Sequence, residues 1–144
     1  MGDLVWQKWF EIGHDTIDFE HKTFFSLIHK AHSFAEEGRS KVDIRRVLDE
    51  LLKYTDFHFT SEENVMAECD YPGLAEHKKV HNELMMKFRE DVTNYEAGAI
   101  SAQEIVVFLF DWLLKHTITE DIDISAAVKK KNLSAYFKTA QRSL

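Results

Sequence analysis

The stretch FHFTSEENVMAECDYPGLAEHKKVH, residues 57–81, decides the fold. Its first part closes a helical pattern of apolar residues that begins near residue 41, and Pro72 with Gly73 then breaks the chain. A second helical pattern starts immediately after this break. Because the connection is so short, the two predicted helices must run antiparallel to each other.

The same helical spacing occurs in two further segments of the chain. Gly38 and Gly98 are predicted helix stops, and Ser101 followed by Glu104 has the form of a capping box. The apolar spacing predicts helices at about 18–37, 41–68, 74–97 and 101–118. Their short connections predict an all-α, up-down-up-down antiparallel four-helix bundle.

Two segments flank the predicted bundle, whose core covers about residues 18–121. An N-terminal aromatic arm, with Trp6, Trp9 and Phe10, should cover one flank of the bundle. A short C-terminal helical tail is predicted at about 122–144. Its apolar residues should pack in the same way or contact another domain; they are Leu133, Tyr136 and Phe137. A chain of 144 residues is long enough for one core, so residues 1–144 are predicted to form a single domain.

Composition and charge narrow the class of protein. The formal net charge of −7 argues against nucleic acid as a partner, because phosphate binding needs clustered Lys and Arg. No apolar run approaches the roughly 20 residues that a membrane-spanning helix needs. Cys69 is the only cysteine, and the N-terminal residues lack the pattern of a secretory signal. We therefore expect a cytoplasmic protein without a membrane span.

Seven polar residues interrupt the apolar faces of the predicted helices. They lie near the start of the first and third helices and near the end of the second and fourth, so an antiparallel bundle brings them to the same end. They are His21, His58, Glu62, His77, His81, His116 and, five residues after His116, Asp121. The sequence therefore predicts one layer of imidazole and carboxylate groups inside the bundle.

Such a layer needs a compensating positive charge. Burying an unpaired carboxylate beside imidazoles costs several kcal/mol, and no Lys or Arg lies on these faces at that height. A metal supplies the charge, and the donors outnumber those that one tetrahedral zinc takes. Two adjacent ions that share two bridging carboxylates would use all of them. Mixed imidazole and carboxylate ligation suits iron, but the spacing leaves manganese, cobalt and zinc open.

The series His21, His58-x3-Glu62, His77-x3-His81 and His116-x4-Asp121 resembles the hemerythrin family, and more closely its bacterial members. The similarity extends from about Trp6 to Asp121 and fills every ligand position. The neighbouring residues agree with it: Ile17-Asp18 before Glu20-His21-Lys22, His58-Phe59, Glu62-Glu63, Tyr71-Pro72 and Trp112-Leu113.

This resemblance implies two non-haem iron ions joined by an oxo or hydroxo bridge, with dioxygen as the ligand. One iron would bind His77, His81 and His116, the other would bind His21 and His58, and both would share Glu62 and Asp121. The second iron would keep a vacant position for dioxygen. The residues implied around that position are Phe59, Trp112, Leu113 and Thr117.

Thr117 departs from the family pattern, which commonly has a bulky aliphatic residue directly after the fourth-helix histidine. Its hydroxyl could face the pocket, where it would donate to the ligand or recruit water. Alternatively, the hydroxyl bonds to the carbonyl of Leu113 one turn earlier and never faces the site. The remaining histidines match no ligand position and are expected at the surface; they are His14, His29 and His32.

The resemblance implies reversible dioxygen binding rather than enzymatic turnover, for oxygen carriage, storage or delivery to an oxygen-consuming enzyme. The alternative is an oxygen or redox sensor domain of a signalling or chemotaxis receptor, which would use the same di-iron site and relay its state to a partner. A di-iron oxidase is disfavoured, because those bundles use mostly carboxylates whereas five histidines accompany two carboxylates here. The sequence leaves the oligomeric state open.

Overall fold

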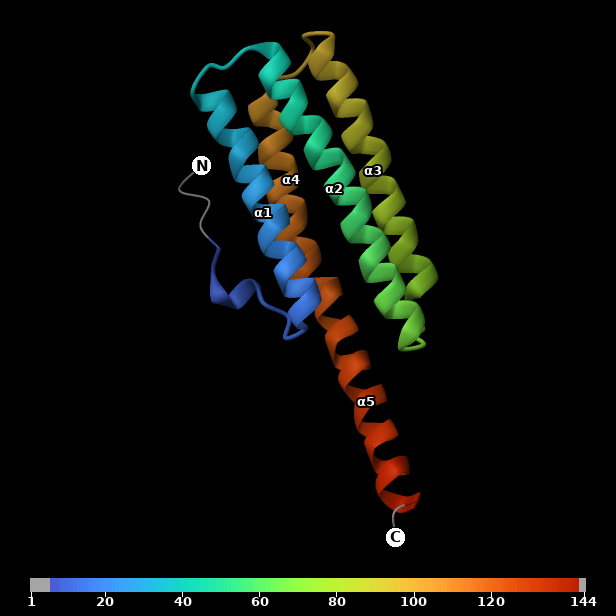
Figure 1. Ribbon diagram of the computed structural model, residues 1–144. Coiled ribbons are helices and arrows are strands. Elements are labelled where there is room, and N and C mark those ends of the chain that lie inside the picture. Colours follow the sequence, from blue (N-terminus) through green and yellow to red (C-terminus); the bar gives the residue numbers. More distant parts are fainter. Residues whose placement is uncertain (1–5, 143–144) are drawn as a thin grey trace.

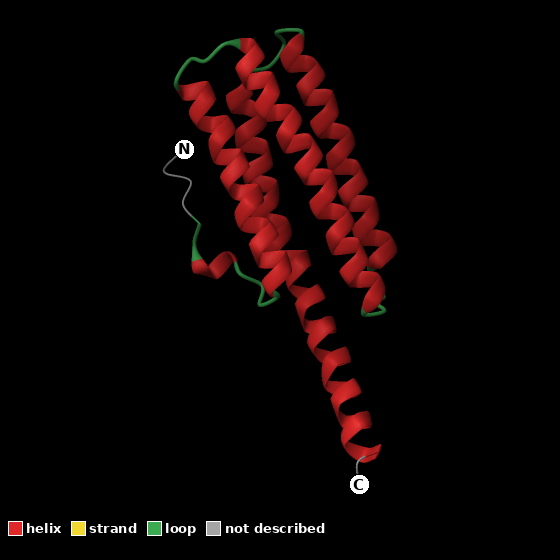
Figure 2. Cartoon of the chain, viewed as in Figure 1, coloured by secondary structure: helices red, strands yellow, loops and turns green. Residues whose placement is uncertain are grey.

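Four long helices form an antiparallel bundle in the computed structural model, which describes residues 6–142 and the burial of side chains as far as residue 135 (Figure 1). α1 packs against α2 and α4, and α3 packs against the same two helices. The helices are α1 (Asp15–Glu36), α2 (Lys41–Glu68), α3 (Leu74–Glu96) and α4 (Ala102–His116). The described residues contain no strand (Figure 2), and the predicted all-α bundle is confirmed.

The helix ends follow local signals that the sequence carries. The Ser40 hydroxyl accepts a hydrogen bond from the Asp43 amide and opens α2. Ser101 and Glu104 form both bonds of a capping box at the start of α4. Gly38 has φ 66° and Gly98 has φ 78°, a left-handed conformation that glycine adopts without a Cβ clash. These signals explain why the predicted boundaries of α2 and α3 lie within a residue of the observed ones.

The N-terminal arm covers the flank of the bundle formed by α1 and α4. The rings of Trp6 in the arm and Phe25 in α1 lie 6.1 Å apart, edge to face. Phe10, also in the arm, is buried against the core. The third aromatic residue of the arm, Trp9, is 59% exposed and leans on Phe10 instead. The expected role of the arm therefore belongs to Trp6 and Phe10.

The C-terminal segment is helical over nearly the whole range predicted for the tail, but it is continuous with α4. α4 passes through a π-helical turn, η2 (Thr117–Asp121), directly into a long helix, α5 (Ile122–Arg142), which projects past the end of the bundle (Figure 1). The segment after His116 contains no Gly or Pro, so nothing in it stops a helix.

The packing expected for the tail holds only near its start. Ile124 is fully buried and Val128 packs beside it, whereas Leu133 is 56% exposed, so the expected packing of Leu133 is wrong. The side chains of Tyr136 and Phe137 lie outside the described residues. Of the helices described, none combines the length and apolar character needed to cross a membrane.

Candidate metal centre

Seven buried side chains meet at the end of the bundle where α1 and α3 begin and α2 and α4 end. Their donor atoms form two overlapping groups, within each of which all donor atoms lie within 4.8 Å of one another. The first group is Glu62, His77, His81, His116 and Asp121, and the second is His21, His58 and Glu62. The structure thus brings together all of the predicted ligand residues.

Regular helix geometry accounts for two pairs in the layer. His58 and Glu62 on α2, like His77 and His81 on α3, are four residues apart and therefore point the same way.

His116 and Asp121 need a different geometry, because a step of five residues turns an ordinary α-helix by about 140° away from the starting face. The π-helical turn at Thr117–Asp121 adds the missing residue per turn and brings Asp121 Oδ1 to 3.1 Å from His116 Nε2.

Each of the two carboxylates faces both groups of histidines. Glu62 Oε2 lies 3.1 Å from Nε2 of both His21 and His58, while Oε1 lies 3.1 Å from His81 Nε2. Asp121 Oδ1 lies 3.0 Å from His77 Nε2, and Oδ2 lies 3.2 Å from His21 Nε2. The two oxygens of one carboxylate therefore point at different sets of nitrogen donors, which is the arrangement that a bridging carboxylate requires.

The donor set fits metal cations. His116 Nε2 and His77 Nε2 face each other at 3.0 Å, and neither carboxylate is ion-paired with a Lys or Arg of the described residues. Glu62 Oε1, His81 Nε2 and both oxygens of Asp121 are buried without a hydrogen bond among the described residues. Buried polar atoms left in this way are costly, and cations placed between them would satisfy them.

The histidines and carboxylates shift one another's pKa values when no metal separates them. Burial lowers the pKa of His21, but Asp121 and Glu62 outweigh it and raise this pKa to about 10. The same balance of burial against Asp121 and Glu62 raises the pKa of His77 to about 9. Burial raises the pKa of Glu62, yet the charge on His58 holds it well below its usual range. The metal-free centre therefore holds protons that a cation must displace.

Three further carboxylates surround the layer, and none of them is among the ligand or pocket residues predicted from the sequence. Glu20 Oε1 lies 2.8 Å from His58 Nδ1, and Glu63 Oε2 lies 3.0 Å from His81 Nδ1. Glu120 Oε2 lies 3.3 Å from His116 Nδ1. Glu20 and Glu63 stand beside His21 and Glu62 in the motifs that carry the family resemblance, and Glu120 follows His116 by four residues on the same helical segment.

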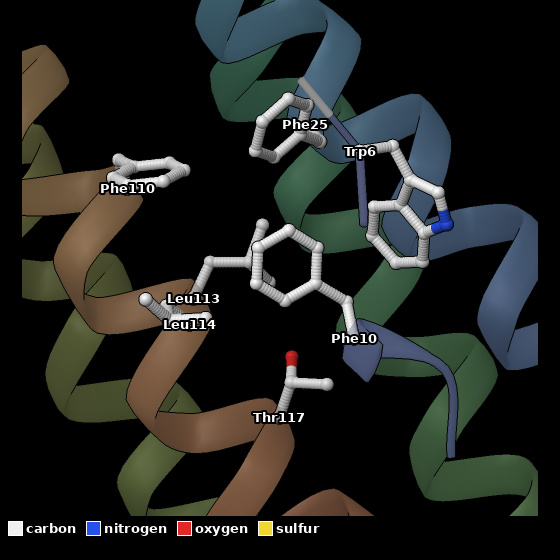
Figure 3. A pocket seen from close by; sticks show the side chains of 7 residues that line it. All are labelled: Trp6, Phe10, Phe25, Phe110, Leu113, Leu114 and Thr117. Carbon is white, nitrogen blue, oxygen red and sulfur yellow. The ribbon is translucent and has the colours of Figure 1, made fainter. Parts of the chain in front are cut away.

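The residues predicted to line the oxygen pocket lie in two places. Phe59 stacks on His81 with ring centroids 3.8 Å apart, and Trp112 stacks on His116 at 4.3 Å. Leu113 and Thr117 instead line a cavity of about 10 Å³ between α1, α4 and the N-terminal arm (Figure 3). Its other walls are Trp6, Phe10, Phe25, Phe110 and Leu114.

The hydroxyl of Thr117 points into this cavity (Figure 3) and has no hydrogen-bond partner among the described residues. The Leu113 carbonyl accepts a bond from the Thr117 amide, and the expected alternative in which the Thr117 hydroxyl binds that carbonyl does not occur. Thr117 is 3% exposed, so its hydroxyl is a buried polar group in an otherwise apolar cavity.

The three histidines expected at the surface take no part in the layer. His14 caps α1, where its Nδ1 accepts a hydrogen bond from the Ile17 amide. The rings of His29 and His32 lie near each other on the outer side of α1, and neither residue is buried.

The fold and the donor set together define a class of protein: a metal-binding four-helix bundle with a buried histidine and carboxylate centre between its helices. Comparisons with known proteins narrow this class. The family model described as the hemerythrin HHE cation binding domain matches residues 12–127. This match covers most of the chain, which therefore belongs to the hemerythrin family.

Individual relatives agree with this assignment. A bacteriohemerythrin of Stenotrophomonas maltophilia is 33% identical over 129 residues, which cover 90% of this chain and 84% of that protein. A myohemerythrin of Riftia pachyptila is 31% identical over 112 residues, with 78% and 82% covered. A crystal structure of wild-type hemerythrin matches with a TM-score of 0.79 and 29% identity, covering 86% of this chain and 96% of that one.

Proposed function

We propose that this chain binds dioxygen reversibly at two iron ions, with His77, His81 and His116 on one ion and His21 and His58 on the other. Glu62 and Asp121 would bridge the pair. The observation that carries this proposal is the division of each bridging carboxylate between the two histidine groups. Membership of the hemerythrin family supports iron over the other metals that the donor types allow.

The iron pair would supply the electrons that hold dioxygen and take them back when it leaves. The protein's part is to hold the imidazoles and carboxylates in place for ions that displace the protons of the metal-free centre, and to keep water away. The rings of Phe59 and Trp112, stacked on His81 and His116, place apolar surface against the polar layer. We propose a binding protein rather than an enzyme, and membership of the hemerythrin family and the histidine-rich donor set support this.

Carriage, storage or delivery of oxygen in the cytoplasm is the function that we favour. A sensor function is the second candidate, and one observation supports it: α5 begins directly after the ligand Asp121 and extends past the bundle (Figure 1). A displacement of Asp121 would pass into α5 without a flexible loop between them. Distances between spin labels on α2 and α5, measured with and without oxygen, separate the two functions, since a carrier needs no change there.

The direct test combines a metal count with absorption spectra. We expect about two irons per chain and a visible band that appears when the reduced protein meets air and disappears when oxygen is removed. One zinc per chain, together with no oxygen-dependent band in iron-loaded protein, would overturn the proposal.

A further inference from the structure

Three of the five histidines in the layer have a carboxylate oxygen within 3.3 Å of Nδ1, the ring nitrogen that faces away from the layer. In each of these rings the opposite nitrogen, Nε2, faces the bridging carboxylates. An ionised carboxylate only accepts hydrogen bonds, so Nδ1 must carry the proton and donate it to the carboxylate. The lone pair of Nε2 is then free for a cation.

The three contacts differ in how far they are shielded from water. The Glu20 side chain is 9% exposed, and its second oxygen accepts a hydrogen bond from the Ser61 hydroxyl at 2.7 Å. Glu63 is 18% exposed, and Glu120 is 44% exposed. Because water and salt screen a charge more strongly at the surface, the electrostatic effect on the layer should fall in this order.

The charges around the layer are strongly unbalanced. Five carboxylates surround it when the two bridging groups are included. Within the described residues, the single Lys or Arg ion-paired with any of the five is Lys78, 3.9 Å from Glu63 and 60% exposed. Two divalent ions bring four positive charges and two trivalent ions bring six. An excess of fixed negative charge therefore favours the trivalent pair.

We propose that Glu20, Glu63 and Glu120 are positioning residues that fix the protonation of the ligand histidines and lower the reduction potential of the metal pair. The assignment rests on the proposed function only for the identity of the metal. The two histidine groups are held unequally. Two of the three carboxylates contact the group of His77, His81 and His116. In the other group, His21 Nδ1 has no hydrogen-bond partner among the described residues.

The test replaces charge while keeping a hydrogen-bond acceptor. Glu20→Gln, Glu63→Gln and Glu120→Gln each keep an amide oxygen for Nδ1–H, so metal content should stay near the wild-type level. The reduction potential of the iron-loaded protein should rise, most in Glu20→Gln and least in Glu120→Gln. For Glu20→Gln we expect about a tenfold change in the one-electron equilibrium constant, or about 59 mV.

Glu83→Gln is the matched control. Glu83 is exposed on α3, two residues after His81, so this substitution removes the same charge at a residue that does not contact the layer. Glu63→Ala tests positioning itself, since it deletes the acceptor. It should weaken zinc binding by about 10- to 100-fold, whereas Glu83→Ala should not. Zinc serves as the probe so that this arm does not depend on iron chemistry.

The outcomes separate this inference from the proposed function. A wild-type protein without an oxygen-dependent band overturns the proposed function, and the zinc measurement still decides whether Glu63 positions His81. A wild-type protein with the band, Gln variants whose potentials match that of Glu83→Gln, and Glu63→Ala with unchanged zinc affinity overturn this inference alone. If Glu20→Gln fails to fold, Glu63→Gln against Glu83→Gln carries the comparison of potentials.

Discussion

The two ends of the bundle use the same four helices in opposite ways. Where α1 ends and α2 begins, the core is built mainly from apolar side chains such as Leu48, Val92 and Ile105, and the buried Asp91 is ion-paired with Lys87. At the other end, the same buried faces carry five histidines and two carboxylates. The apolar end stabilises the fold by removing hydrocarbon from water, whereas the polar end costs free energy until cations occupy it. Apolar packing therefore stabilises one end of the bundle, whereas the other end needs bound cations to offset the cost of its buried polar groups.

The strongest way to break this comparison is Glu62→Ala. The substitution removes oxygens that face both histidine groups, so the protein should lose at least one of the two proposed irons and, with it, the proposed oxygen-dependent band. His29→Ala is the control, because His29 is exposed and lies off the layer. Metal analysis of both variants after identical purification decides the matter. Iron loss from His29→Ala with none from Glu62→Ala would show that the layer is wrongly assigned.

A substitution at the apolar end should lower the stability of the fold and leave the metal content unchanged. Leu48 is fully buried, and Leu48→Ala should lower the free energy of unfolding by about 2–5 kcal/mol through lost contacts and a cavity. The iron content of the folded protein should stay at the wild-type level. Urea unfolding of the metal-loaded protein gives the first quantity and metal analysis the second. Loss of iron from this variant would mean that the two ends are not independent.

The pH dependence of the metal-free protein sharpens the comparison further. The folded pKa values of about 10 for His21 and about 9 for His77 lie above the ordinary value of 6.5. Their contribution to stability is therefore fully present below pH 6.5 and is lost as the pH rises through about 9 and then 10.

Unfolding free energies at pH 6.5 and pH 10, with and without metal, test this expectation. The metal-free protein should be less stable at the higher pH, while the metal-loaded protein should lose less, because an imidazole nitrogen bound to a metal carries no proton to lose. Equal losses in both forms would contradict the expectation. Metal uptake near neutral pH should also release protons, which a weakly buffered solution with an indicator would detect.

The smallest expected effect concerns Thr117. Its unpaired hydroxyl faces the cavity beside Leu113 (Figure 3), and we expect this hydroxyl to attract water there, one residue from His116. Thr117→Ile removes that hydroxyl and adds hydrocarbon. Loss of the oxygen-dependent band should slow by up to about fivefold, the equivalent of one hydrogen bond, with metal content unchanged.

Thr119→Val is the matched control for Thr117→Ile, since the Thr119 hydroxyl already bonds to the Lys115 carbonyl on the outer side of the helix. Decay rates of the band at one pH and temperature decide the outcome. Equal rates in Thr117→Ile and wild type would mean that the hydroxyl does not govern water entry. Faster decay in the variant would mean that the threonine protects the bound oxygen.

Much of this arrangement could be read from the sequence. Apolar spacing of three and four residues set the four helices, and Gly38, Gly98, Ser101 and Glu104 marked their ends through local backbone chemistry. The seven polar interruptions, together with antiparallel order, placed all the layer residues at one end. These properties are local or follow from helix direction alone, so they need no knowledge of how side chains meet.

Other features depended on how the helices pack. The continuity of α4 with α5 and the π-helical turn that aims Asp121 inward could not be read from apolar spacing, because a shift of one residue in the backbone register changes which face a side chain occupies. The choice of Glu20 and Glu63 as partners of Nδ1 atoms on other helices, and the direction of the Thr117 hydroxyl, depend on rotamers that packing between elements selects. A sequence pattern specifies the face of a helix, whereas contacts between helices specify the atom that points at the metal.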